Sequence, residues 1–394
     1  MNRWTAYVAS NLLAFVLVAP AAGQTRFDTI YTFTNGYPVG LTASSGELYG
    51  AFQGLGSTGI GCGVVFELQP PPTGNGAWPE AVLYSFGEAT TDACDPAFTP
   101  IFGADGALYG TAVAWGGYGL GALYQLQPPA FSGGSWTEST PYSFPAFPAS
   151  GPVLGPRGSI YVLNGDNELM QLAPPSAQGG NWTGTVLYNF PFGTLVDSLI
   201  EGTGGVLYGT SEFGGLAPGQ MGEVFELKPP SGPGGAWAYQ TLHSFGYGNG
   251  DAGNPNSLTL ASDGTIYGTT YGASITGGLG EGAVFELTPP ASPGAGWAYT
   301  ILKNFGGLHL DSPLILRNGS VYGALASATG GAVFELQPPS TAGASWTLVF
   351  LHNFTNGQVP FGQMVMDQRG VLYGATGITD GQSQSGTVYQ IETQ

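Results

Sequence analysis

The stretch DGTIYGTTYGASITGGLGEGAVFELTPP, from Asp263 to Pro290, contains most of the information that decides the fold. It begins with Asp263-Gly264, continues with an aromatic strand and a glycine-rich loop, and ends with a second strand followed by two prolines. Asp-Gly between two runs of β-branched and aromatic residues predicts a tight hairpin in which both turn residues have positive φ. The stretch therefore predicts neighbouring short strands joined by turns.

Three signatures of this kind recur in a fixed order along the chain. The first is G-x-[LIV]-Y, the second is a strand like VFEL, and the third is a Trp followed eight residues later by a Phe. The tyrosines of the first signature lie on average about 54 residues apart, close to the ~40–50 residues of a four-stranded propeller blade. These tyrosines are Tyr49, Tyr109, Tyr161, Tyr208, Tyr267, Tyr322 and Tyr373.

Each repeat consists of four predicted short strands rich in Val, Ile, Tyr, Phe and Thr, which suits a packed sheet. No segment keeps a 3.6-residue apolar period, so we expect almost no helix. Stacked blades bury sheet faces that one blade alone leaves exposed. The sequence thus predicts an all-β fold, a seven-bladed β-propeller with four strands in every blade.

The two ends of the chain predict how the ring closes. Residues 27–33, FDTIYTF, match the third signature without its Trp, and the chain ends on GTVYQIETQ, which matches the second. The last repeat therefore lacks its fourth strand. We expect residues 27–33 to supply that strand by pairing with residues 386–391, because ring closure removes exposed sheet edges.

The N-terminus has the pattern of a signal peptide. Arg3 precedes the apolar run AYVASNLLAFVLVAP and the small residues AAGQ, which predicts cleavage after Gly23. No other stretch reaches the length of a membrane span. We therefore expect a signal peptide at 1–23 and one propeller domain at 24–394. The protein is predicted to be secreted or periplasmic, monomeric and not inserted in a membrane.

Charge excludes one class of partner. Only 8% of residues are charged, and the formal net charge is -18. Such a charge repels the phosphate backbone, so we expect no nucleic-acid partner.

The two cysteines, Cys62 and Cys94, are an even number in a chain predicted to be exported, which favours one disulfide. Both fall in loops that we expect on the same face of neighbouring repeats. Two free thiols are the alternative.

The segments DGTIYGTT, GAVFELTPP and W-x7-F resemble the tandem repeat called GloVer (Gloeo/Verruco), which occurs in exported bacterial proteins. The resemblance covers nearly all of the chain after the predicted leader. A kelch propeller blade has a similar layout. The resemblance implies a propeller fold and an exported setting, and it supplies no catalytic residue.

The repeat separates structural from functional residues, because a residue type that recurs at one position of the repeat is structural. His243 and His352 stand two residues before the Phe of the third signature, where other repeats have Tyr or, at position 303, Lys, so we interpret them as structural. His309 lies outside the signatures, beside Asp311, which makes it a candidate acid or base. A solvent-exposed histidine without a function is the alternative.

The loops between second and third strands, and those leading to the next repeat, vary most and are expected to share one face. Variable loops on a rigid scaffold usually carry the binding residues. These loops contain Asp92, Asp95, Trp115, Tyr118, Glu212, Asp251, Tyr271, Glu281, His309, Asp311 and Asp380. An acidic, solvated surface without a ligand is the other interpretation.

Within this set we predict that Trp115 and Tyr118 stack on a ligand. Every other Trp after the predicted leader belongs to the third signature, whereas Trp115 lies in the loop sequence AWGGYGLG. The predicted polar contacts are Asp92, Asp251, His309 and Asp311.

The loops also contain candidate metal-binding and catalytic residues. Asp92, Asp95 and Asp251 offer oxygen atoms of the kind that calcium binds, but no EF-hand pattern surrounds them. We predict no cofactor, with calcium at these aspartates as the alternative. No nucleophile elbow, zinc motif or phosphate loop is present in the sequence. The candidate catalytic residues are therefore limited to His309, Asp311 and Tyr271 of the variable loops.

Three functions follow from these observations. The first is ligand binding on the variable loops, with a glycan or another envelope component as the ligand. The second is a polysaccharide lyase or a glycoside hydrolase that uses carboxylate, His or Tyr side chains on the same face. The third is a structural or protein-interaction module.

Overall fold

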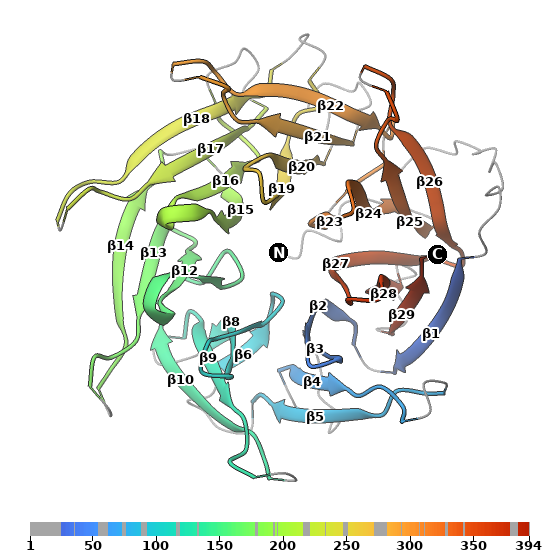
Figure 1. Ribbon diagram of the computed structural model, residues 1–394. Helices are drawn as coiled ribbons and strands as arrows, with labels where there is room; N and C mark the ends of the chain where they lie inside the picture. The colour runs from blue at the N-terminus through green and yellow to red at the C-terminus, as the bar shows by residue number, and fades with distance from the viewer. Residues whose placement is uncertain are drawn as a thin grey trace.

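The computed structural model describes residues 25–393 apart from 35, 54–61, 73–75, 88–92, 116–118, 132–133, 178–179, 192–193, 195, 216–220, 233, 247–250, 272–281, 293, 307, 311, 328–329, 342 and 379–384. The predicted signal peptide lies outside these residues. Seven antiparallel sheets stand as blades around a central axis, as Figure 1 shows. The predicted seven-bladed, all-β propeller is confirmed.

Each blade has strands a to d from the centre outward. Blade 1 contains β2 (Pro38–Ser44), β3 (Glu47–Phe52), β4 (Val64–Leu68) and β5 (Glu80–Ser85). Blade 2 contains β6 (Ala93–Pro96) with β7 (Ile101–Phe102), then β8 (Leu108–Trp115), β9 (Ala122–Gln127) and β10 (Thr137–Ser143). Blade 3 contains β11 (Val153–Leu154), β12 (Ile160–Leu163), β13 (Glu168–Ala173) and β14 (Thr183–Asn189).

The remaining blades follow the same order. Blade 4 contains β15 (Val196–Glu201), β16 (Leu207–Ser211), β17 (Glu223–Lys228) and β18 (Ala238–Ser244). Blade 5 contains β19 (Pro255–Leu260), β20 (Ile266–Thr270), β21 (Ala283–Thr288) and β22 (Ala298–Asn304). Blade 6 contains β23 (Ile315–Arg317), β24 (Ser320–Ser327), β25 (Gly330–Gln337) and β26 (Thr347–Phe354). Blade 7 contains β27 (Gln358–Met366), β28 (Val371–Ile378), β29 (Gly386–Glu392) and β1 (Arg26–Phe33).

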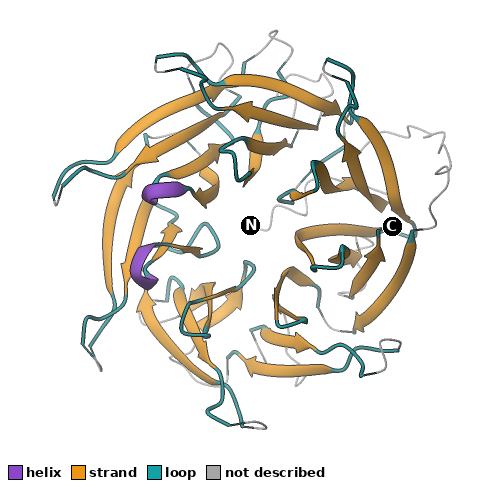
Figure 2. Ribbon diagram, viewed as in Figure 1, coloured by secondary structure: helices purple, strands orange, loops and turns teal. Residues whose placement is uncertain are grey.

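Two details depart from a strictly four-stranded, helix-free ring. Strand a of blade 2 is broken into β6 and β7, which both pair with β8. Two single-turn 3-10 helices, η2 (Pro156–Gly158) and η3 (Thr203–Gly205), occupy the turns between strands a and b of blades 3 and 4 (Figure 2). Across the described ranges, no helix has the length and apolar character needed to cross a membrane.

The N-terminal strand closes the ring as predicted. Strand β1 runs antiparallel to β29, from the pair Phe27–Ile391 to the pair Phe33–Gly386. Phe27 stacks on His352 of blade 6 with ring centroids 3.5 Å apart, and Phe33 packs against Phe66 of blade 1 at 4.9 Å. The strand thus contributes both backbone pairing and apolar contacts to the two blades beside it.

The tyrosines of the first signature pack between blades. Tyr109 of blade 2 lies against Trp182 of blade 3, with ring centroids 5.7 Å apart. Tyr373 of blade 7 lies 5.6 Å from Trp78 of blade 1, so the same contact spans the two ends of the chain. The signature tyrosines therefore contribute to the packing of one blade against the next.

The hydroxyl groups of these tyrosines are anchored inside their own blades. The Tyr49 hydroxyl donates to Glu47 at 2.7 Å and to Glu67 at 3.4 Å. In blade 2 the Gln125 amide donates to the Tyr109 hydroxyl at 2.7 Å. Glutamate in blade 1 and glutamine in blade 2 therefore both hydrogen-bond to the signature tyrosine from this position.

The expected turn geometry at Asp263-Gly264 is wrong. Only Gly264 has positive φ, at 89°, because the turn includes one more residue than expected. The Ala261 amide donates to the Thr265 carbonyl at 2.8 Å, and the Asp263 carboxylate accepts the Thr265 amide at 2.9 Å. This is the three-residue hairpin with glycine in the left-handed position.

Candidate functional site

The variable loops meet on one face of the ring, here called the loop face. It comprises the loops from strand b to strand c and the segments from strand d to strand a of the next blade. Between blades 1 and 2, the Cys62 amide donates to the Phe86 carbonyl at 3.1 Å, and the Asp95 amide donates to the Cys62 carbonyl at 2.7 Å. The Phe86 amide donates to the Gly63 carbonyl at 2.9 Å. These three bonds join the two kinds of loop.

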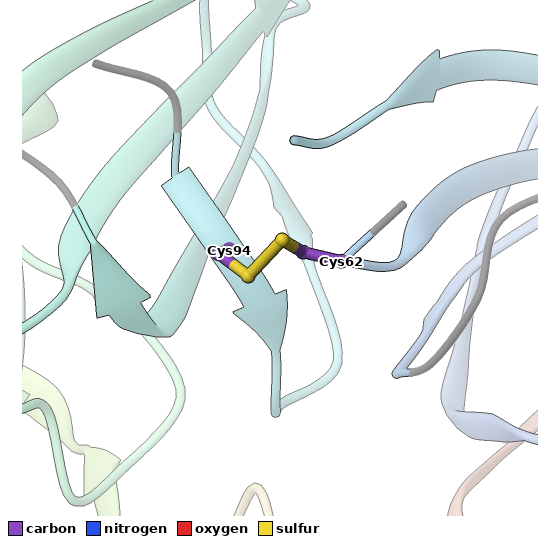
Figure 3. The surroundings of a disulfide bond; sticks show 2 residues. All are labelled: Cys62 and Cys94. Atoms are coloured by element: carbon purple, nitrogen blue, oxygen red, sulfur yellow. A yellow bond between two sulfur atoms is a disulfide. The ribbon is translucent and has the colours of Figure 1, made fainter. Parts of the chain in front are cut away.

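A disulfide reinforces this junction. Cys62 and Cys94 are bonded, with their Cα atoms 4.9 Å apart, and Figure 3 shows Cys94 on strand β6. The bond links the b–c loop of blade 1 to the first strand of blade 2. The predicted pairing is confirmed, and a bridge of this kind typically contributes ~2–4 kcal/mol of stability.

Strand β6 extends the ladder that carries Trp115. Ala93 pairs with Trp115, Cys94 with Ala114, and Pro96 with Ala112. The backbone of Trp115 is therefore held at the loop face, directly beside the disulfide. The described structure of this residue is limited to its backbone, and Tyr118 and Asp92 lie outside the described residues.

The junction between blades 4 and 5 repeats the same three hydrogen bonds. The Met221 amide donates to the Phe245 carbonyl at 3.2 Å, the Phe245 amide to the Gly222 carbonyl at 2.9 Å, and the Asn254 amide to the Met221 carbonyl at 2.7 Å. Asn254 has φ of 50°, and Asp95 has φ of 60° at the matching position. Met221 and Gly253 stand here in the positions of Cys62 and Cys94, and they form an apolar contact in place of the disulfide. The contact is close, since a Cβ added to Gly253 would lie only 2.5 Å from Met221 Cε.

Asn254 links two predicted site residues. Its side chain is buried, and the amide group donates to the Glu212 carbonyl at 3.0 Å. Its backbone carbonyl accepts the Tyr271 amide at 2.8 Å. The b–c loops of blades 4 and 5 are thus joined through one residue of the segment between them.

Tyr271 and His309 form an aromatic pair on the loop face. Their rings stack with centroids 4.3 Å apart at an angle of 26°, and His309 Nδ1 donates to the Tyr271 carbonyl at 2.9 Å. Since a carbonyl oxygen only accepts, Nδ1 carries a proton in this hydrogen bond. The structure therefore brings together two residues that the sequence placed in separate loops, whereas Asp311 lies outside the described residues.

Asp251 is placed differently from the expected exposed ligand contact. Its side chain is 8% exposed, and Oδ1 lies 3.5 Å from His243 Nε2. His243 stacks on Tyr299 with ring centroids 3.9 Å apart, and burial lowers the pKa of this histidine. Asp251 thus supports the packing of blades 4 and 5, and the structural interpretation of His243 agrees with these contacts.

The calcium candidates do not converge in the described parts of the chain. Asp95 belongs to the junction of blades 1 and 2, where burial raises the pKa of its carboxyl group. Asp251 belongs to the junction of blades 4 and 5. Among described residues no group of three or more His, Cys, Asp or Glu side chains is arranged to hold a metal ion.

Most of the cationic residues after the predicted leader lie away from the loop face. Arg157 and Arg369 occupy turns between strands a and b, and Arg317 ends an a strand. Lys228 ends a c strand and Arg26 begins a d strand, so all five positions belong to the opposite face. Lys303 is the exception, because it stands one residue before the end of the outer strand β22, at the end of that strand that leads into the loop face. The sequence of the loop-face segments contains no lysine or arginine, so their carboxylates give this face a negative charge.

Sequence reasoning missed a repeated contact between a glycine and a proline at these junctions. A Cβ on Gly63 would lie 2.6 Å from Pro96 Cδ, and a Cβ on Gly222 would lie 2.8 Å from Pro255 Cδ. The dipeptides Asp95-Pro96 and Asn254-Pro255 are the signal that could have revealed it, because Asp-Pro and Asn-Pro mark turns.

Three solved structures illustrate the likeness in fold. A fungal alcohol oxidase of the AA5 family, solved with copper, has a TM-score of 0.56 at 13% identity and covers 93% of this chain and 76% of its own. The β-propeller domain of Cps50 (Swd1) from Myceliophteria thermophila has a TM-score of 0.55 at 10% identity. The match covers 94% of this chain and 100% of that domain. The polysaccharide lyase Uly1 has a TM-score of 0.52 at 10% identity, and the match covers 90% of this chain and 89% of the lyase. At such identities the likeness shows the fold alone.

No curated protein matches the chain. The Gloeobacter/Verrucomicrobia repeat matches residues 194–394, just over half of the sequence. This span includes the loops that carry Tyr271, Asn254 and His309. The chain belongs to the Gloeobacter/Verrucomicrobia repeat family.

Proposed function

We propose that the protein is an exported propeller that binds a glycan, or another component of the cell envelope, on its loop face. The observation that carries the proposal is the Tyr271–His309 pair, which is fixed by stacking and by a 2.9 Å hydrogen bond. Neither residue belongs to a repeat signature, so the fold itself does not require the pair. Aromatic faces beside polar groups suit the apolar and hydroxyl faces of a sugar.

The charge of the loop face narrows the class of glycan. Its segments contain no lysine or arginine, and Asp95, Glu212 and Asp251 are among its acidic residues. A ligand rich in carboxylate or sulfate groups would be repelled. The proposed ligand is therefore a neutral glycan or one that carries amino groups.

Two features support the exported setting. The Cys62–Cys94 disulfide is of the kind that persists in oxidising compartments. The first 23 residues have the sequence pattern of a signal peptide. Secretion to the medium and retention in the periplasm both agree with these features.

The test is a glycan array that contains neutral, amino-bearing and acidic sugars, probed with the mature protein and with Trp115→Ala. We expect binding to neutral or amino-bearing glycans, a several-fold loss in Trp115→Ala, and a nearly unchanged melting temperature. Phe131→Ala is the control, because Phe131 is 72% exposed in a c–d link on the opposite face. A large stability loss in Trp115→Ala with unchanged binding would contradict the proposal.

A polysaccharide lyase is the second candidate. The observation in its favour is that His309 and Tyr271 stack on each other, because histidine and tyrosine side chains can serve as a general base and a general acid. The lyase Uly1 shares the fold. Against it stands the lack of lysine and arginine in the loop-face segments, since a lyase must neutralise the carboxylate of its sugar.

An assay for unsaturated sugar products separates the two candidates. If the wild type forms unsaturated products and His309→Ala does not, while both proteins have the same melting temperature, the protein is a lyase and does not merely bind the glycan. If the array and the assay are both blank, the chain is better explained as a structural or protein-interaction module.

A further inference from the structure

We infer that the Cys62–Cys94 disulfide positions the ligand-binding part of the loop face, so that binding there depends on the oxidised bridge. The inference rests on the proposed function. It assigns to the bridge a role beyond stability, because the bridge holds the strand that pairs with Trp115.

The first observation is the length of the ladder between strands a and b. In blades 1, 4 and 5 the described ladder ends three residues after the signature tyrosine, at Phe52, Ser211 and Thr270. In blade 7 it reaches Ile378, five residues after Tyr373. In blade 2 it continues to Trp115, six residues after Tyr109. The extension places the backbone of Trp115 beyond the shared part of the blade.

The second observation is the path of the chain just before strand a. Gly253 has φ of 72°, in the left-handed region, so the chain turns there before Asn254. Cys94 is the counterpart of Gly253, and it is part of strand β6 and pairs with Ala114. The disulfide is attached at a position where the backbone conformation differs between the two described segments. We infer that the bridge keeps this segment extended.

The third observation explains why the fold itself does not need the bridge. The three backbone hydrogen bonds around Cys62 recur around Met221, where there is no disulfide. The blade junction therefore forms without a covalent link. Without the bridge, the extra pairs Ala93–Trp115 and Cys94–Ala114 would form the end of a ladder, and ladder ends open locally at a low free-energy cost.

If the end of the ladder between β6 and β8 is open in the free protein, the ligand must restore the extended ladder as it binds. The free-energy cost of this ordering weakens binding. We expect Cys62→Ser/Cys94→Ser to remain folded and to show faster amide hydrogen exchange at residues 93–95 and 112–115, by about tenfold. On the array of neutral and amino-bearing glycans it should lose binding as strongly as Trp115→Ala. Wild-type protein treated with reductant should behave in the same way.

Met221→Ser is the matched control, because it removes the contact with Gly253 at the equivalent junction. It should leave hydrogen exchange at residues 112–115 unchanged. Unchanged exchange in the cysteine variant would overturn the inference, whatever the array shows. If Trp115→Ala loses binding while the cysteine variant binds like wild type, the inference fails and the proposed function stands. If Trp115→Ala binds like wild type, the proposed role of this surface fails, and exchange alone then decides whether the bridge orders the ladder.

Discussion

Between blades 1 and 2, Cys62 is bonded covalently to Cys94, whereas between blades 4 and 5 Met221 packs against Gly253 at the same positions of the repeat. The backbone hydrogen bonds around the two sites are the same. Both junctions also have a residue with positive φ before a proline, Asp95 in one and Asn254 in the other.

The comparison teaches that the repeat specifies the backbone of a junction and leaves its side-chain chemistry open. A covalent bond acts mainly by restricting the unfolded chain. An apolar contact acts in the folded state by removing surface from water. Two junctions with one geometry can therefore differ in how they respond to reductant, denaturant and pH.

The largest expected effect is that of opening the ring, which would show whether both junctions depend on closure. Deleting residues 24–34 removes β1, exposes the edge of β29, and takes away Phe27, Ile30 and Phe33. We expect a fall in melting temperature well over 10 °C, since a loss of ~1 kcal/mol already lowers it by ~2–4 °C in a protein of this size class.

The deletion should be measured by calorimetry with and without reductant. If both junctions depend on ring closure, the deletion should lower the melting temperature by a similar amount with and without reductant. A deletion variant that melts like the full mature protein would show that β1 does not close the ring.

The next effect tests the backbone that the junctions share. Gly63 and Gly222 have φ of 118° and 90°, and a Cβ would lie 2.5 Å from the Phe52 carbonyl oxygen and 2.1 Å from the Ser211 carbonyl oxygen. Gly63→Ala and Gly222→Ala should each cost about 3–5 kcal/mol, from backbone strain together with the clash.

Urea unfolding of both variants checks this prediction, with Gly46→Ala as a control. Gly46 has φ of 89° but has open space where its Cβ would be, so it isolates the strain. A loss at Gly63 no larger than at Gly46 would mean that the close approach is unimportant.

The disulfide variant separates the two junctions by mechanism. Cys62→Ala/Cys94→Ala should lose about 2–4 kcal/mol, because the unfolded chain gains freedom. The urea m-value should rise, because the unfolded state expands. Met221→Ala should lose stability through packing and keep its m-value. Equal m-values for the cysteine variant and the wild type would contradict the entropic explanation.

The smallest effect concerns pH. Burial lowers the pKa of His243 below its ordinary value of 6.5, so below about pH 6.5 the unfolded chain binds more protons than the folded one. Stability contributed by the neutral ring is thus present above pH 6.5 and is lost as the pH falls toward the lowered pKa. Blade 1 has Tyr84 at the same position, so the junction of blades 1 and 2 lacks this sensitivity.

His243→Tyr should reduce the loss of stability between about pH 7 and pH 5 by less than about 1 kcal/mol. Melting temperatures across this range provide the measurement, and Tyr84→Phe serves as a control that leaves the pH profile unchanged. An acid sensitivity that persists in His243→Tyr would assign it to other groups.

Most of the fold could be predicted because its determinants are periodic. The G-x-[LIV]-Y signature recurs in every blade, so Tyr109 and Tyr373 occupy equivalent positions in blades 2 and 7. The unmatched strand at residues 27–33 indicated that the two ends of the chain close the ring. The disulfide could also be predicted, because repeat positions indicated that Cys62 and Cys94 lie on one face of neighbouring blades, although Cys94 belongs to strand β6 and not to a loop. Such patterns are local in sequence, and the ring only stacks copies of them.

The site could be predicted only in part, because its residues have no repeat to constrain them. Tyr271 and His309 were both candidates, but their stacking depends on loops from two blades. Asp251 looked like an exposed loop residue, and its burial beside His243 results from the packing of two outer strands.

The sequence by itself determined the number of blades, the order of strands, the closing strand and the pairing of the cysteines. Hydrophobic periodicity and turn chemistry act over a few residues, so they can be read along the chain. Only the tertiary structure decided the extension of β8 to Trp115, the linking role of Asn254 and the distribution of charge between the two faces. These depend on distances between loops far apart in sequence, which closure of the ring sets.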